Sequence, residues 1–138
     1  MEDLELIKDS SEIEYTDDYH PIYPDSKDAL EIGFTSDKFH GYLWKDKDSI
    51  HLSLIVSLYE GKGNTRRLIE SIKEKYSVIK ACEVSERMRN LLNLQGFKEE
   101  IIDVKYLGKY KGLVWRKWYE GEYWINSLIF SYITNIHI

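Results

Sequence analysis

The chain has 138 residues, of which 43% are hydrophobic and 31% charged, and this is the balance of a soluble globular protein with one domain. Its formal net charge of −5 argues against a nucleic-acid binder, because such proteins are usually basic. The single cysteine, Cys82, excludes a disulfide framework and a thiolate zinc site within one chain. The other candidate ligands, His20, His40 and His137, are scattered, so we expect no metal site.

The first five residues, MEDLE, are acidic where a secretory signal would be basic. No apolar run approaches the roughly 20 residues that a membrane-spanning helix needs. We therefore expect a cytoplasmic protein with no membrane partner.

Acidic residues are concentrated at the start of the chain. Residues 1–31 hold eleven acidic and two basic residues. Pro21 and Pro24 lie in the same stretch and favour turns. These features predict that residues 1–38 form an acidic, irregular part of the domain.

A β-hairpin is predicted over residues 39–58. Residues 39–44 (FHGYLW) are typical of a strand, residues 45–48 (KDKD) of a turn, and residues 50–58 alternate in polarity. The alternation predicts a half-buried strand. The side chains expected on its apolar face are Ile50, Leu52, Leu54, Val56 and Leu58, and those expected on its other face are His51, Ser53, Ile55 and Ser57.

Two helices separated by a strand are predicted next. The first is amphipathic and follows the loop EGKGNTRR, with the apolar positions Leu68, Ile69, Ile72 and Tyr76. Residues 77–84 predict a short strand. Ser85 can cap the second helix, Gly96 ends it, and Met88, Leu91 and Leu92 face inward.

The C-terminal part is rich in aromatic residues. Residues 97–104 predict a strand, and Gly108 and Gly112 are expected to bracket a turn before another strand over 113–119. Residues 125–138 fit both a helical and a strand pattern, so periodicity does not decide between them. The apolar tail and the surplus of aromatic residues suggest a homodimer.

A glycine loop between a strand and a helix is a common site for phosphate. Backbone N–H groups and the positive end of the helix both face the anion there. The basic side chains Lys62, Arg66 and Arg67 lie at the same place. The spacing of the glycines fits neither the P-loop nor the dinucleotide-binding motif.

The order of the predicted strands and helices in residues 39–106, and the motifs between them, resemble those of the GNAT acyltransferase superfamily. Gly61-Lys62-Gly63 fits the family's glycine motif R/Q-x-x-G-x-G/A, and the second helix closes in Gly96-Phe97 as the family's does. Glu60 stands where the motif has Arg or Gln, and Thr65 stands where it has Gly or Ala. The resemblance implies a single α/β domain of mixed α+β type, with a central mixed sheet flanked by helices. Residues 39–106 would form the cofactor-binding core and residues 107–138 an aromatic strand region and tail.

This resemblance implies that the chain binds acetyl-CoA as a co-substrate. The pantetheine arm would pair like a strand with Ile55, Val56 and Ser57, and a backbone N–H near Val56 would donate to the thioester carbonyl. The residues implied for the pyrophosphate are Gly61, Lys62, Gly63, Asn64, Thr65 and Arg66.

His51 is the candidate catalytic base, because its ordinary pKa is near 6.5 and it lies on the strand that leads to the loop. The alternatives are a surface or packed histidine at this position, with Glu31, Glu83 or water as the base. Leu92 occupies the position where the family often has a tyrosine as the leaving-group acid. Tyr106 or Tyr110 could take that role.

The function that the resemblance implies is transfer of the acetyl group of acetyl-CoA to an amine acceptor. A cationic small molecule or a protein lysine would be favoured if the acidic residues of the N-terminal part line the site. These residues are Asp17, Asp18, Asp25 and Asp28. The alternative is a catalytically weak GNAT-fold module that binds or inhibits another protein by direct contact.

Overall fold

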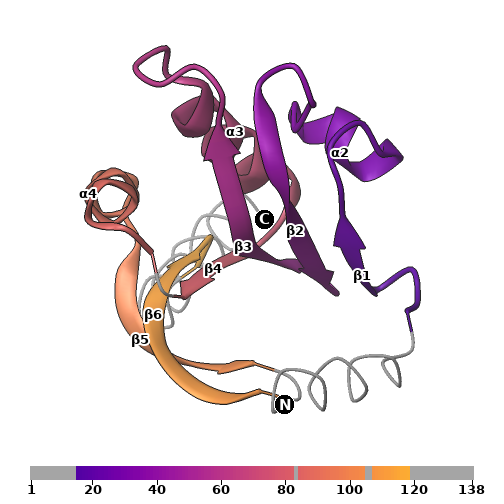
Figure 1. Ribbon diagram of the computed structural model, residues 1–138. Coiled ribbons are helices and arrows are strands. Elements are labelled where there is room, and N and C mark those ends of the chain that lie inside the picture. Colours follow the sequence, from indigo (N-terminus) through magenta and orange to yellow (C-terminus); the bar gives the residue numbers. More distant parts are fainter. Residues whose placement is uncertain (1–14, 83, 105–106, 119–138) are drawn as a thin grey trace, which may run out of the picture.

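The computed structural model describes residues 15–82, 84–104 and 107–118, and these form a single small α+β domain (Figure 1). The elements are β1 (Tyr19–Ile22), α2 (Lys27–Ile32), β2 (Phe39–Asp46), β3 (Ser49–Ser57), α3 (Asn64–Lys75), β4 (Val78–Cys82), α4 (Glu86–Leu94), β5 (Lys98–Val104) and β6 (Gly108–Arg116). Within these ranges, no helix has the length and apolar character needed to cross a membrane.

The six strands of the described residues form one mixed sheet in the order β1-β2-β3-β4-β6-β5. Only the neighbours β3 and β4 run parallel, and the other neighbouring pairs are antiparallel. This parallel pair needs a crossover, which α3 supplies. The mixed sheet with helices packed on it confirms the general architecture expected from the sequence.

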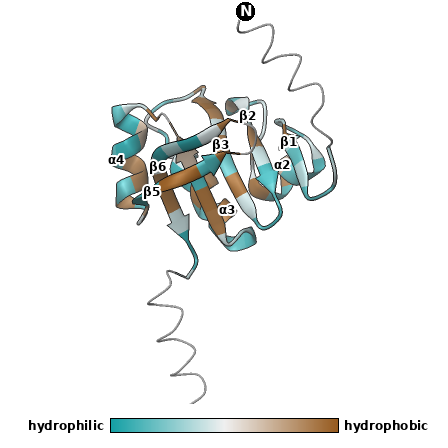
Figure 2. Cartoon of the chain, turned by 90° about the horizontal axis from the view of Figure 1, so that it is seen from below, coloured by the Kyte–Doolittle hydropathy of each residue, from teal (hydrophilic) through white to brown (hydrophobic). Residues whose placement is uncertain are grey.

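One hydrophobic core joins the helices to the sheet. Ile69 of α3 and Leu92 of α4 are fully buried against sheet residues such as Ile50 and Ile79. We call the side of the sheet that carries Ile50 and Ile79 the core face, and the opposite side the second face. Figure 2 shows the largest stretches of hydrophobic residues in the strands, and hydrophilic residues mixed with hydrophobic ones along α4.

The predicted start and end of α4 are confirmed. The Ser85 hydroxyl accepts a hydrogen bond from the Met88 N–H at 3.2 Å. Gly96 adopts a φ of 90° just after the helix, and the Phe97 N–H then donates to the Leu92 carbonyl at 3.0 Å. Such left-handed residues satisfy the last carbonyls of a helix and favour glycine.

The prediction that residues 1–38 are irregular is wrong for Tyr19–Ile32, which contain β1 and α2. Pro21 is tolerated because β1 is an edge strand that pairs only with β2. The Ser26 hydroxyl caps α2 by accepting from the Ala29 N–H at 3.3 Å. Both elements are short, so they leave little periodicity in the sequence.

The prediction of a turn between Gly108 and Gly112 is also wrong, because β6 begins at Gly108 and continues through Gly112. A Cβ atom on Gly112 would lie 2.5 Å from the Ala81 carbonyl oxygen of β4 and 2.5 Å from Cδ1 of Ile102. Gly112 therefore permits close packing in a hairpin that curls strongly (Figure 1). The predicted continuation to residue 119 and the tail 125–138 lie outside the described residues.

A bulge divides β3. The register pairs Trp44 with His51 and Tyr42 with Leu54, so β3 advances by one residue more than β2 between these pairs. Past the bulge the faces exchange: Ile55 packs against the core, whereas Leu54 is 51% exposed. The uninterrupted alternation predicted for residues 50–58 is therefore wrong beyond Leu52.

Candidate functional site

The parallel strands β3 and β4 part after a short paired stretch. The pairing runs from Ser49 opposite Val78 to His51 opposite Lys80. Beyond His51, β3 continues to Ser57 without pairing with β4, whereas β4 remains paired with β6. We call residues 52–57 of β3 the divergent segment, because among the described residues they have a strand partner on the β2 side only.

The β2–β3 ladder determines which peptide groups of the divergent segment face away from β2. The Leu58 N–H donates to the Lys38 carbonyl at 2.8 Å. Antiparallel ladders bond in alternate pairs, so Val56 also exchanges hydrogen bonds with β2. The N–H and C=O groups of Ile55 and Ser57 then point toward the side from which β4 has departed. This geometry favours Ile55, rather than the Val56 expected from the sequence, as the donor on that side.

The glycine loop leads directly from the divergent segment into α3. Gly61 and Gly63 have φ angles of 80° and 76°, which are left-handed values that favour glycine. Gly63 is the N-cap and forms no side-chain capping bond. The first N–H that bonds within the helix is that of Arg67, which donates to the Gly63 carbonyl at 3.1 Å. The preceding N–H groups, from Asn64 on, therefore have no acceptor within the helix.

Basic side chains surround these N–H groups. Nη2 of Arg67 donates to the Lys62 carbonyl and to Oδ1 of Asn64, at 2.7 Å in each case, which holds its guanidinium against the loop. Lys62 and Arg66 are exposed beside it. A helix N-terminus with this charge is suited to an anion.

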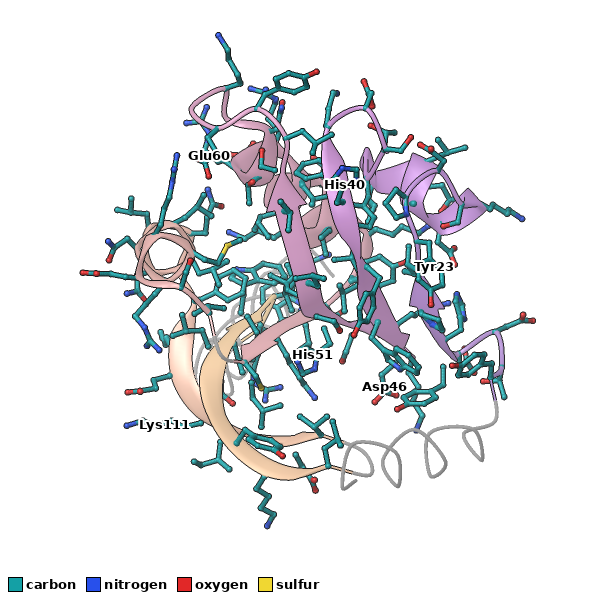
Figure 3. The ribbon with its side chains drawn as sticks, in the orientation of Figure 1. Tyr23, His40, Asp46, His51, Glu60 and Lys111 are labelled. Atoms are coloured by element: carbon teal, nitrogen blue, oxygen red, sulfur yellow. The ribbon has the colours of Figure 1, made fainter. Side chains whose placement is uncertain are left out.

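Glu60, the acidic departure from the family motif, is held by α4. Its carboxylate accepts from Nη1 of Arg87 at 2.7 Å, and Figure 3 shows Glu60 on the side of the loop nearest α4. Because both side chains are largely exposed, the ion pair contributes little to stability. It does give the carboxylate a cationic partner, which reduces the repulsion between Glu60 and an anion on the loop.

His51 lies at the last paired position of β3, at the end of the strand opposite the glycine loop (Figure 3). Burial lowers the pKa of its imidazole below the ordinary 6.5, and the nearby Lys80 ammonium lowers this pKa further. The ring is therefore neutral at neutral pH. A neutral imidazole is the form that can accept a proton.

The alternative acid and base residues are placed elsewhere or are not described. Glu31 forms an ion pair with Lys75 at the end of α3. The Tyr110 hydroxyl donates to the Leu107 carbonyl at 2.8 Å in the β5–β6 hairpin. Leu92 is fully buried in the core. Glu83 and Tyr106 lie outside the described residues.

Two of the carboxylates proposed to attract a cationic substrate, Asp25 and Asp28, have partners within the domain. Asp25 accepts hydrogen bonds from the side chain and backbone of Ser36, and these bonds lower its pKa. Asp28 accepts from Nε2 of His20 at 2.9 Å, and this bond lowers its pKa despite partial burial. Asp17 and Asp18 precede β1, whose first residue pairs with the last residue of β2, Asp46. They therefore lie away from the glycine loop, at the end of the sheet that also carries His51.

Sequence reasoning did not identify Lys80. The alternation of residues 78–82 (VIKAC) places it on the face opposite Ile79 and Ala81, and this could be recognised from the sequence. Its position beside His51 depends on the β3–β4 register, which the sequence does not specify.

Comparison with known protein families, curated protein sequences and solved structures finds no match to this chain. Among residues 15–82, 84–104 and 107–118, no group of three or more His, Cys, Asp or Glu side chains is placed to hold a metal ion. The candidate site therefore consists of the divergent segment, the glycine loop, the start of α3, and His51 with Lys80.

Proposed function

We propose that the chain is an N-acetyltransferase of the GNAT type, which transfers the acetyl group of acetyl-CoA to an amine. The observation that carries this proposal is the divergence of β3 from β4 beside a cationic glycine loop. This arrangement lets one extended ligand contact both the peptide groups of Ile55 and Ser57 and the first N–H groups of α3. A ligand with an extended amide arm and a diphosphate matches both parts.

The residues fit the two ends of such a ligand. The pantetheine amides can pair with Ile55 and Ser57 as an additional strand would, since these peptide groups face away from β2. The pyrophosphate can accept from the N–H groups at Asn64 and Thr65, with Lys62 and Arg66 nearby. The left-handed glycines allow the backbone to approach the phosphates closely.

The chain's own groups then have definite roles. The Ile55 N–H donates to the thioester carbonyl oxygen, where negative charge develops. His51 accepts a proton from the acceptor ammonium and so frees the nitrogen lone pair. When bound, acetyl-CoA would supply an activated acetyl group: its C–S bond breaks as the C–N bond forms, and the released thiolate takes up a proton from solvent.

Isothermal titration calorimetry with acetyl-CoA tests the binding claim. Gly63→Asp places a carboxylate at the start of α3 and should weaken binding by at least about tenfold. The matched control is Gly33→Asp, because Gly33 has the same φ of 76° but lies in open space at the end of α2. This control should retain the wild-type affinity. No heat at millimolar acetyl-CoA would contradict the proposal.

Mass spectrometry of amines incubated with protein and acetyl-CoA tests the transfer itself. The expected result is a mass increase of the acceptor by one acetyl group. His51→Gln should abolish most of this product while leaving the heat of acetyl-CoA binding unchanged. Binding without any transfer would instead support the catalytically weak module acting through protein contact.

A further inference from the structure

A row of nitrogen-bearing side chains crosses the second face of the sheet at the level where β3 and β4 last pair. Trp44 of β2 is in register with His51 of β3, and His51 with Lys80 of β4. Their chain neighbours Leu43, Ile50 and Ile79 are buried in the core, so these three side chains lie on the second face. Facing side chains on neighbouring strands are close enough to share one ligand.

This row contains hydrogen-bond donors without acceptors. Lys80 is half-buried, yet its ammonium forms no ion pair or hydrogen bond with any residue that the structure describes. The indole Nε1 of Trp44 is buried, again with no acceptor among the described residues. The half-buried Lys80 and the unsatisfied indole N–H of Trp44 lie on either side of His51, and a buried donor is costly unless something accepts from it.

Among the residues that the structure describes, no acidic side chain forms an ion pair with Lys80. Glu100 is bonded to Arg116 of β6, with Nη2 to Oε1 at 2.9 Å and Nε to Oε2 at 3.2 Å. Asp46 lies two residues beyond Trp44, at the end of β2 (Figure 3). Among charged groups, it is Lys80 that lowers the pKa of His51. Among the described residues, the charge that acts on the imidazole is therefore a positive one.

We propose that Lys80 binds a carboxylate or a similar small acidic group of the acceptor, so that the acceptor is an amino acid or a related amino acid derivative rather than a simple cationic amine. This inference rests on the proposed acetyltransferase function. A purely cationic acceptor would be repelled by Lys80 on its approach to His51. A zwitterionic acceptor places its carboxylate on Lys80 and its ammonium beside the imidazole that takes the proton.

Paired acceptors that differ only in the carboxylate test this specificity. With acetyl-CoA, phenylalanine should exceed phenethylamine in kcat/KM by about tenfold or more, as expected for a hydrogen bond to a charged group. Glycine should exceed methylamine similarly. Lys80→Met should remove this preference and Lys80→Arg should largely retain it. Lys45→Met removes a positive charge from β2, where Lys45 donates to the Asp17 carbonyl, and should leave the preference intact.

An NMR titration of the His51 ring gives a readout that needs no catalysis. 3-Phenylpropionate without acetyl-CoA should raise the pKa of His51, because its carboxylate offsets the Lys80 charge and it carries no ammonium of its own. Phenethylamine should not raise it, and in Lys80→Met 3-phenylpropionate should have no effect. If acetyl-CoA fails to bind but 3-phenylpropionate still raises this pKa, the acetyltransferase proposal fails and the carboxylate site stands. If acetyl-CoA binds but the decarboxylated amines are preferred and the pKa does not respond, the carboxylate site is overturned alone.

Discussion

The two halves of β3 belong to one strand but have different surroundings. Before the bulge, Ile50 is fully buried and its strand is paired on both sides. After the bulge, Leu54 and Val56 are 51% and 46% exposed, and β2 is the strand's only partner in the part of the chain that the structure describes. The first half has the satisfied backbone and buried side chains of a central strand, whereas the second half resembles an edge strand inside a sheet.

This contrast separates what stabilises the fold from what is available for binding. An edge strand with free peptide groups invites pairing with another extended chain, and proteins usually cover or charge such edges. Here the free groups of Ile55 and Ser57 lead to a cationic glycine loop, so the feature fits a ligand with an extended arm and an anionic end. The following predictions test whether the two halves differ as described.

The largest effect is expected at Gly41, which shapes the junction between the halves. Gly41 is paired with Ile55 and has a φ of 113°, and a Cβ atom there would overlap the carbonyl of Leu54. Gly41→Ala should lower the free energy of unfolding by at least about 3 kcal/mol, from strain and overpacking together. Urea denaturation of the variant and the wild type measures this difference in unfolding free energy.

Gly33→Ala is the matched control, since it adds the same methyl group at a left-handed position with nothing within 4 Å. Only backbone strain then remains, about 1 kcal/mol. An equal loss of unfolding free energy in both variants would mean that the junction at Gly41 is not tightly packed.

The next effect compares the side chains of the two halves directly. Ile50→Ala should destabilise the protein by about 3 kcal/mol, because it leaves a cavity in the core. Leu54→Ala removes a half-exposed side chain and should cost less than about 1 kcal/mol. Thermal unfolding of both variants provides the comparison. A loss at Leu54 as large as that at Ile50 would contradict the exposed position of the divergent segment.

The smallest effect concerns the pH dependence of stability at His51, where the halves meet. Because the folded pKa is below the ordinary 6.5, the unfolded state takes up this proton first as the pH falls. Stability should therefore decrease as the pH falls from about 6.5, by at most about 1.4 kcal/mol per pH unit, and His51→Gln should remove this contribution. Denaturation of both proteins between about pH 7 and 5.5 measures it. Identical slopes in that range would show that burial does not disfavour the charged imidazole.

Much of the fold could be predicted from local sequence patterns. The β2–β3 hairpin, the amphipathic α3 and the capping of α4 by Ser85 follow from periodicity and from side chains that bond to nearby backbone. The prediction errors arise where contacts between segments far apart in the sequence determine the local structure. Position 112 of β6 carries a glycine because Ala81 of β4 approaches it closely, and no local pattern records that approach.

The candidate site was predictable in its loop but not in its details. The glycines and basic residues before α3 are contiguous in the sequence, so their grouping could be recognised. The bulge that turns Ile55 toward the core and exposes Leu54 depends on the register with β2. The proximity of Lys80 to His51 likewise depends on a parallel pairing of strands that are separated by a helix.

Amide hydrogen exchange of the divergent segment, measured by NMR with and without acetyl-CoA, tests the central claim most directly. Without acetyl-CoA, the Ile55 and Ser57 amides should exchange much faster than the Val56 amide, which the ladder bonds to β2. With acetyl-CoA, the Ile55 and Ser57 amides should become protected while that of Val56 changes little. Protection of Ile55 and Ser57 before acetyl-CoA is added, or exchange that remains fast at saturating acetyl-CoA, would contradict the account.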